Sequence, residues 1–478
     1  MSGPGITLVW IRRDLRLHDH EALSAAVMRG GPVIPVFIHD ESVSGLGAAP
    51  KFRLGLGLKV FAKTLAGCGS GLILRKGPAQ QVLRDLILES GASAVYWQRA
   101  YDPASVVRDT EVKTALRSAG IEARSFAGHL LHEPWTVETG QGSYYKVYTP
   151  FWRAVQGRDL PTPLPAPGHL PAPEVWPSSD LLADWQLGAG MKRGADVLAP
   201  YIDAGEAAAL DRLDEFTNGP VADYASHRDL PGEDGTSRLS EYLSLGEISP
   251  RLCVLAAKRA EEQGRAGAQT FFKQLVWRDF AWHLTWHSPH LLSDNWRAGW
   301  EGFPWREDEN LPDLLAWKQG RSGIPLVDAG LREMYVTGRM HNRARMVVAS
   351  YLTKHLLGHW RIGMRWFEEC LVDWDPACNA MGWQWVAGCG PDAAPYFRIF
   401  NPESQAAKFD PKSTYRQRWI AEGTSRPSAQ ALSYFDAVPV GWKLTADAPY
   451  RAPVMSLAAG RERALAAYHA RASDTPST

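Results

Sequence analysis

The sequence predicts two domains, an α/β domain built on a parallel, doubly wound sheet and an all-α domain that follows it. Two observations predict this. In the first 130 residues, short apolar runs alternate with amphipathic stretches, and beyond about residue 199 the apolar residues have helical spacing. Alternating strands and helices give a parallel sheet that helices cover on both faces. The length of 478 residues also favours more than one domain.

Four apolar runs in the α/β domain, residues 1–130, are expected to be buried strands. They are ITLVWI, PVIPVFI, GLILRKG and SAVYWQR, and the segments RLGLGLKVFAKTLAG and AQQVLRDLILES carry apolar residues at helical spacing. The arrangement is Rossmann-like, but no G-x-G-x-x-G or G-x-x-x-x-G-K-[ST] motif follows a strand. Dinucleotide and triphosphate sites of those two types are therefore excluded.

A proline-rich segment separates the two halves of the chain. PTPLPAPGHLPAPEVWP has seven prolines in seventeen residues, which argues against a helix or a central strand. We therefore expect an extended connector over residues 131–199. The helical domain is expected at 200–465, and residues 466–478, ending in ASDTPST, are expected to be a frayed tail.

Two helices of the second domain can be placed from local signals. Ser249 and Pro250 form a helix start, because the serine oxygen can cap the first turn and proline suits its first position. The segment from Asn342 to Leu357 is apolar around much of its circumference and predicts a buried helix.

Composition narrows the class of protein. Lys+Arg and Asp+Glu both number 52, so the overall charge gives no argument for nucleic acid. No apolar run reaches the roughly 18 residues of a membrane span, and the N-terminus has no apolar core with a cleavage site, which predicts a cytoplasmic protein without a membrane partner. The cysteines lack a C-x-x-C pair and predict buried thiols rather than a metal site. They are Cys68, Cys253, Cys370, Cys378 and Cys389.

Charge and tryptophan are both distributed unevenly. The segment 334–366 contains six Lys or Arg and no Asp or Glu. It predicts either a groove that faces phosphates or a solvated helix face, and charge alone does not decide between them. Twelve of the twenty tryptophans lie between residues 277 and 385. They suit the core of a large helical domain, but their number also suggests an aromatic function.

Three motifs carry polar side chains at informative spacing. GTSRLSEYLSLGEISP places the hydroxyls of Thr236, Ser237 and Ser240 around Arg238, an arrangement that holds a phosphate or merely caps a helix.

In VTGRMHNRARMVVAS, Asn342 and Arg345 share one helix face, and Arg343 and Met346 share the adjacent face. One helix can then present polar surfaces to two ligands.

In DWDPACNAMGWQW, the side chains two apart along the helix point in roughly opposite directions. An acidic residue near a buried arginine needs a partner, and Asp373 is the natural one for Arg345.

These motifs together resemble the photolyase/cryptochrome family of flavoproteins. GTSRLSEYL, LVWRDF, MHNRARM, NAMGWQW and DAAPYFRIFNP occur in the family's order and spacing, and the resemblance runs from VWIRRDLRLHDHEAL to NPESQAAKFDP. It implies an N-terminal α/β domain, a long connector and a helical domain that buries FAD in a U-shaped conformation. It also implies UV-damaged DNA as the partner of a monomeric enzyme.

The resemblance assigns roles to individual residues. The FAD phosphates and ribityl chain would be held by Tyr224, Thr236, Ser237, Arg238, Leu239 and Ser240. The flavin would be lined by Asn342, Arg345, Asp373, Asp375 and Asn379, the last hydrogen-bonding near flavin N5. An electron-transfer chain to the surface would consist of Trp383, Trp360 and Trp317. The damaged bases or the strand would be faced by Arg228, Gln274, Trp277, Arg278, Arg343, Met346, Trp385 and Gln405.

Within the family, three activities compete. The resemblance is strongest to microbial cyclobutane pyrimidine dimer photolyases of class III or class I, which split the dimer by electron transfer from photoexcited reduced FAD. Repair of (6-4) photoproducts would need two histidines where this chain has Asn342 and Met346. A signalling cryptochrome would often carry a long disordered tail and replace Asn379.

Two departures from the family's pattern bear on function. Folate-binding class I members have an Asn–Glu pair where this chain has Ala104 and Ser105, so the presence of an antenna chromophore, methenyltetrahydrofolate or a deazaflavin, stays open. Gln274 stands where the cyclobutane enzymes usually have Glu. Glutamine keeps a donor and an acceptor of the same shape, but it has no acidic proton.

Overall fold

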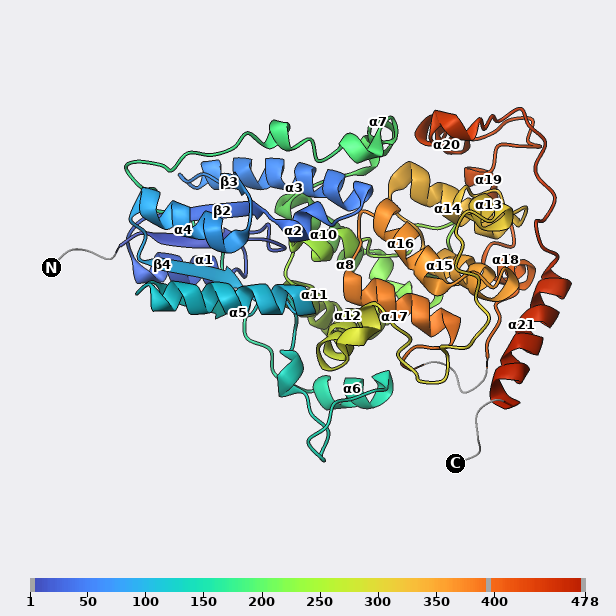
Figure 1. Cartoon of the computed structure of the whole chain (residues 1–478), viewed down its shortest axis with the longest axis horizontal. Coiled ribbons are helices and arrows are strands. Elements are labelled where there is room, and N and C mark those ends of the chain that lie inside the picture. The colour runs from blue at the N-terminus through green and yellow to red at the C-terminus, as the bar shows by residue number, and fades with distance from the viewer. Residues whose placement is uncertain (1–4, 393–396, 474–478) are drawn as a thin grey trace.

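The computed structural model describes residues 5–392 and 397–473. An α/β domain and a larger helical domain lie side by side, and the later part of the connector runs along the outer edge of the α/β domain to the helical domain (Figure 1). This confirms the predicted fold class. Among the described residues, no helix combines the length and the apolar character needed to cross a membrane.

The sheet of the α/β domain has five parallel strands in the order β3-β2-β1-β4-β5. The strands are β1 (Thr7–Ile11), β2 (Val33–His39), β3 (Ile73–Lys76), β4 (Ala94–Gln98) and β5 (Glu122–Phe126). Four of them match the predicted runs. The fifth, β5, lies at the edge next to β4, and it was not predicted because EARSF has few apolar residues.

Helices cover both faces of this sheet, as a doubly wound arrangement requires (Figure 1). Alternate residues of β1 belong to different cores: Val9 and Ile11 pack on one face, and Leu8 and Trp10 on the other. The helices of this domain are α1 (Glu21–Arg29), α2 (Glu41–Ser44), α3 (Ala48–Gly67), α4 (Ala79–Ser90) and α5 (Pro103–Ser118).

The connector contains short helices as well as extended chain. The residues between 159 and 181 form neither helix nor strand. The short helices are η1 (Pro134–Thr136), α6 (Tyr148–Val155), η2 (Leu182–Trp185), η3 (Ala189–Met191), α7 (Gly194–Leu198) and η4 (Ala199–Tyr201). Helix α6 packs against the helical domain, so this part of the connector belongs structurally to that domain.

The helical domain begins with α8. Its first elements are α8 (Glu206–Asn218), η5 (Pro220–Ala222), α9 (Tyr224–His227), α10 (Ser240–Leu245), α11 (Pro250–Glu262), α12 (Ala268–His287), η6 (Pro289–Leu292), α13 (Pro312–Lys318) and α14 (Pro325–Thr337). They are followed by α15 (Asn342–Ser350), the π-helix η7 (Tyr351–His355), α16 (Trp360–Cys370), α17 (Pro376–Ala387), α18 (Pro402–Phe409), α19 (Thr414–Trp419), α20 (Ala429–Ala437), η8 (Val440–Trp442) and α21 (Leu457–Ser473).

Both predicted helix positions are confirmed. The side chain of Ser249 accepts a hydrogen bond from the backbone N–H of Arg251 at 3.1 Å and caps α11. The buried helix from Asn342 is α15, which continues into the π-helix η7.

The prediction of a frayed tail from residue 466 is wrong up to Ser473, because α21 continues to that residue. Its Tyr468 ring stacks on Phe397 with ring centroids 4.6 Å apart, so tertiary packing holds the helix.

Buried ion pairs join the two domains. Arg53 on α3 donates to Glu247 at 2.9 Å, and Arg251 on α11 pairs with Asp19 at 2.6 Å. All four side chains are almost completely buried. Removing one partner of such a pair leaves an uncompensated buried charge and costs about 3–5 kcal/mol. The interface therefore fixes the α/β domain firmly against the helical domain.

Candidate functional site

A carboxylate at the centre of the helical domain gathers two of the motifs found in the sequence. Asp373 Oδ2 accepts hydrogen bonds from the Ser240 hydroxyl and from the Arg345 guanidinium, both at 2.7 Å. The expected pairing of Arg345 with Asp373 is thus confirmed. The Asp373 side chain is only 5% exposed, and its Oδ1 has no hydrogen-bond partner in the described structure. A buried unpaired oxygen is costly, so Oδ1 marks a place for a polar group of a ligand.

The loop before α10 is held by an arginine that no sequence motif indicated. Arg212 on α8 donates to the backbone carbonyls of Thr236 at 2.6 Å and Ser237 at 2.8 Å. Arg238 adopts a left-handed conformation with φ 53° and pairs with Asp234 at 3.0 Å. Arg212 lies on an amphipathic helix more than twenty residues earlier, so no local pattern marked it.

Other groups around this loop are apolar anchors. Leu239 is buried, and Tyr224 packs edge-on against Phe216 and Phe271 with centroid distances of 5.3 and 6.3 Å. Burial raises the pKa of the Tyr224 phenol, so the group stays a neutral donor. The loop therefore combines a fixed backbone with the partly exposed residues Thr236 and Ser237.

Asp375 has protein partners on both carboxylate oxygens. Oδ1 accepts from the backbone N–H of Cys378 at 2.9 Å and caps α17. Oδ2 accepts from Trp282 Nε1 at 3.0 Å and lies 3.9 Å from Arg278 Nε.

The expectation that Arg278 faces damaged DNA is not met. Its guanidinium donates to the backbone carbonyl of His129 at 2.6 Å and is only 11% exposed. Asp375 and the His129 carbonyl compensate its charge inside the protein, which explains why the side chain turns inward.

Helix α15 presents its arginines to different partners, as the spacing predicts. Arg343 pairs with Asp229 at 2.7 Å and lies over the Phe409 ring at 4.1 Å. Its Nη1 is 3.5 Å from Gln405 Oε1. Arg345, two residues on, contacts Asp373 instead.

Three further predicted residues lie near these groups. Asn342 donates to Met346 Sδ at 3.9 Å, in an exposed contact. Arg228 lies over the Tyr224 ring at 5.9 Å.

Gln274 and Trp277 lie three residues apart on α12 and therefore share a face. Both are partly exposed. Trp277 stacks on Tyr148 of α6, a residue that no sequence signal indicated. Trp385 donates from Nε1 to the Asp392 carbonyl at 3.0 Å.

On α17, Asn379 and Trp383 lie one turn apart. Asn379 Nδ2 donates to the backbone carbonyl of Met364 on α16 at 3.0 Å. Trp383 packs against Gly363 so closely that a Cβ there would lie 2.0 Å from the indole ring. Glycine at 363 is therefore required for α16 to approach this tryptophan.

The three predicted electron-transfer tryptophans are all buried. Trp317 contacts Trp383 directly, with ring centroids 6.1 Å apart, but it is 0% exposed and does not reach the surface. Trp360 donates to Asn295 at 2.9 Å and packs on His359, which also contacts Trp305. Trp305 is 8% exposed.

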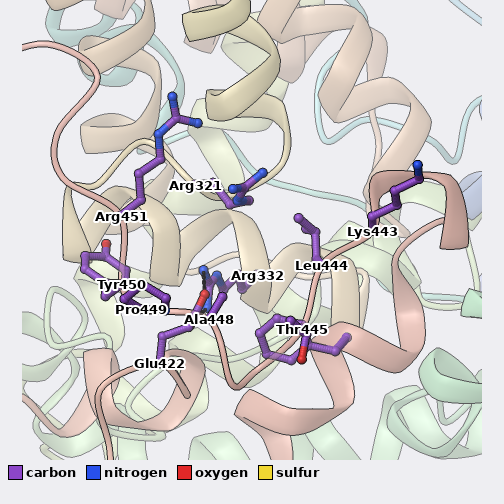
Figure 2. Close-up of a pocket in the computed structure, with 11 residues that line it drawn as sticks. Arg321, Arg332, Glu422, Lys443, Leu444, Thr445, Ala448, Pro449, Tyr450 and Arg451 are labelled. Atoms are coloured by element: carbon purple, nitrogen blue, oxygen red, sulfur yellow. Dashed lines mark hydrogen bonds and ion pairs between the residues drawn. The ribbon is translucent and has the colours of Figure 1, made fainter.

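One cleft of about 440 Å³ lies away from all these residues (Figure 2). At its base Arg332 forms two hydrogen bonds to Glu422, at 2.5 and 2.8 Å. None of the predicted site residues lines it, and its buried arginine is already paired.

Comparison with known proteins identifies the family. Residues 7–168 match the model described as DNA photolyase, and residues 271–470 match the FAD binding domain of DNA photolyase. The chain belongs to the DNA photolyase family. It is 44% identical to the deoxyribodipyrimidine photo-lyase of Agrobacterium fabrum over 97% of both chains. The crystal structure of a bacterial class III photolyase from Agrobacterium tumefaciens has 43% identity and a TM-score of 0.91, with 99% of both chains covered.

Cryptochromes are more distant relatives of this photolyase-family chain. Cryptochrome-1 of Arabidopsis thaliana is 34% identical over 89% of this chain, which corresponds to 64% of the cryptochrome. The Agrobacterium photo-lyase is therefore the more similar of these two relatives.

The residues around Asp373 fit FAD. Its free Oδ1 is an acceptor, and the loop from Thr236 to Ser240 adds partly exposed hydroxyl side chains beside it. Flavin, ribityl and phosphate groups all need such polar partners. The matched FAD-binding model covers Asp373 but not this loop, so the part of the loop in binding FAD stays a prediction.

The two arginines of α15 are expected to have separate effects. Replacing Arg343 with Ala should weaken binding of dimer-containing DNA by about 1–3 kcal/mol, the range for a lost charged hydrogen bond, and should leave the flavin bound. Arg345→Ala is the matched variant, and it should release flavin because Asp373 loses its cation. Fluorescence anisotropy with labelled DNA and flavin absorbance measure the two effects. Flavin loss in Arg343→Ala with intact DNA affinity would exchange the two assignments.

Proposed function

We propose that this chain repairs DNA by splitting cyclobutane pyrimidine dimers under blue light. When bound, photoexcited reduced FAD supplies an electron that opens the cyclobutane ring and then receives it back. The observation that carries the proposal is that α15 directs its two arginines to different acidic partners. Arg345 turns to the cofactor-compatible carboxylate of Asp373, and Arg343 turns to Asp229 beside Gln405.

The protein residues would bind, orient and exclude water. Asp373, Arg345 and Ser240 would hold FAD, and Asn379 would hydrogen-bond near the reactive edge of the flavin. Trp277 and Trp385 would stack on the extruded bases, since base–aromatic stacking is worth about 1–3 kcal/mol per base. Two further groups would neutralise phosphates of the damaged strand. They are Arg228 and Arg343.

Repair of (6-4) photoproducts is less compatible with the site, because a positioned proton donor is missing. The positions that would carry it are Asn342 and Met346. The adjacent histidine, His341, has its pKa lowered to about 4 by burial, and its Nδ1 accepts from the backbone N–H of Arg343. It is therefore neutral near pH 7 and does not replace the missing acid.

Two measurements on the purified protein test the proposed function. Denaturation should release one FAD per chain, with the adenine part present. Blue light should then convert a dimer-containing oligonucleotide into the undamaged sequence in the presence of reductant. Release of FMN alone, or a colourless protein, would contradict the cofactor assignment. Bound FAD without repair would favour signalling.

We also propose that a second chromophore binds in a cleft at the edge of the helical domain, as an antenna. The cleft is lined by Tyr335, Trp366 and Trp442. The Trp366 and Trp442 rings are 6.5 Å apart, and Trp366 Nε1 is buried without a hydrogen-bond partner among the described residues. Flat aromatic walls of this kind suit a pterin or deazaflavin ring. Lys192, which also lines the cleft, suits an acidic tail.

The site expected from class I enzymes is less suitable. Ser105 is buried in α5, and Tyr101 lies just before that helix. The Tyr101 ring packs with Trp135 and Trp286, whose own centroids are 5.0 Å apart.

Replacing Trp442 with Ala should remove the second chromophore and leave FAD bound. Absorbance and fluorescence of the extract from denatured protein identify a pterin or a deazaflavin. Repair should persist with a lower yield at the wavelength that the antenna absorbs. Tyr101→Phe is the control at the class I position, and it should retain the chromophore.

We place the enzyme in the cytoplasm, as a monomer on DNA.

A further inference from the structure

Tyr148, at the start of helix α6, makes a close parallel ring contact with Trp277. The ring centroids are 3.6 Å apart and the planes differ by 6°. The Tyr148 hydroxyl donates to the backbone carbonyl of Lys273 at 2.8 Å, one turn before Trp277 on α12. Phe280 packs edge-on against both rings at 5.8 Å. The tyrosine ring is therefore fixed in place and covers one face of the indole.

The start of helix α6 also lies near Trp385, the other tryptophan predicted to stack on the lesion. Trp385 Nε1 donates to the Asp392 carbonyl at 3.0 Å. The Asp392 carboxylate faces the backbone N–H of Tyr148, and this contact opposes the rise in the Asp392 pKa that burial causes. Arg228 lies close enough to act electrostatically on Tyr148. Tyr148 thus contacts Trp277 directly and lies beside Asp392, whose carbonyl holds Trp385.

Tyr148 belongs to the connector in the chain, although its ring packs in the core of the helical domain. Helix α6 spans Tyr148–Val155, and it lies beside α12, away from the sheet (Figure 1). A partly exposed tryptophan supported on one face keeps its other face available to a ligand. Support of this kind reduces the ordering that binding would otherwise require.

We propose that Tyr148 is a positioning residue of the lesion site, which holds the Trp277 indole in the orientation that stacks on an extruded pyrimidine. The inference rests on the proposed function, because Trp277 acts on the lesion only in that proposal. It adds the connector helix α6 to the elements that determine preference for damaged over undamaged DNA.

The test compares FAD-loaded wild type with Tyr148→Phe, Tyr148→Leu and Trp277→Ala at one salt concentration. The dissociation constant is measured for an oligonucleotide with a cyclobutane dimer and for its undamaged equivalent. Tyr148→Leu keeps apolar volume but loses the flat ring, so it should weaken dimer binding about 2- to 10-fold, the size expected of one aromatic pair. Binding of undamaged DNA should not change. Tyr148→Phe keeps the ring and should rescue dimer binding.

A double-mutant cycle separates positioning from general destabilisation. In the Trp277→Ala background, Tyr148→Leu should cause no further loss, because the ring has nothing left to position. An additive loss, or an equal loss for both DNAs, would overturn the inference. So would wild-type affinity in Tyr148→Leu when Trp277→Ala binds weakly. Failure of wild type to discriminate damaged DNA would instead remove the proposed function, and this inference with it.

Discussion

Replacing Trp383 with Phe should remove most of the light-driven reduction of oxidised flavin. Phenylalanine is much harder to oxidise than tryptophan, and Trp383 is the predicted tryptophan that shares α17 with Asn379. It also has direct ring contact with Trp317. The measurement is the absorbance of oxidised FAD during blue illumination with an external reductant. Repair by chemically reduced protein should survive, since that reaction does not need the chain of tryptophans.

Two matched variants decide where the chain of tryptophans reaches the surface. Trp317 is completely buried, so its electron exchange with a reductant in solution is expected to be slow, and Trp317→Phe should slow photoreduction only modestly. Trp305 packs on His359, which also contacts Trp360, and it is slightly exposed. Trp305→Phe should therefore prevent reduced flavin from accumulating. Unchanged photoreduction in Trp383→Phe would show that another route dominates.

The fold class followed from the sequence because local patterns carry it. Strands β1, β2 and β4 are buried on both faces, as central parallel strands are. Strand β5 is an edge strand. Its sequence, EARSF, is too polar to predict a strand, and it becomes one by pairing with β4. The full length of helix α21 was missed for a related reason. Its stability comes from packing of Tyr468 on Phe397, a contact between distant parts of the chain.

In the candidate site too, some contacts could be predicted from the sequence and others could not. The pairing of Arg345 with Asp373 could be predicted, because a buried carboxylate needs a cationic partner. The inward turn of Arg278 could not be predicted, since its partner His129 is 149 residues away in the sequence. Arg212 and Tyr148 were missed because each acts on a loop or helix far along the chain. Long-range contacts of this kind have no local signal.

Replacing Gln274 with Glu should give repair a pH dependence that the wild type lacks. Gln274 is partly exposed on the same face of α12 as Trp277, so its amide can hydrogen-bond an extruded base as donor and acceptor. Desolvation beside the bound bases would raise the pKa of the introduced glutamate. The variant should repair fastest below this raised pKa, where the carboxyl is protonated and can donate, and should slow as the pH rises through it. The rate of repair across pH measures the effect.

Truncation of the same side chain separates recognition from acid chemistry. Gln274→Ala should weaken binding of dimer-containing DNA by about 0.5–1.5 kcal/mol, the net value of a neutral hydrogen bond, with undamaged DNA bound as before. The wild type should repair at a rate that is flat across the same pH range, because an amide neither gains nor loses a proton there. The Gln274 amide also places no negative charge beside the dimer radical anion, whereas a carboxylate would repel that anion. If wild type fails to repair under blue light while Gln274→Glu repairs, glutamine has removed the activity. Blue-light signalling would then be the better account of the natural protein.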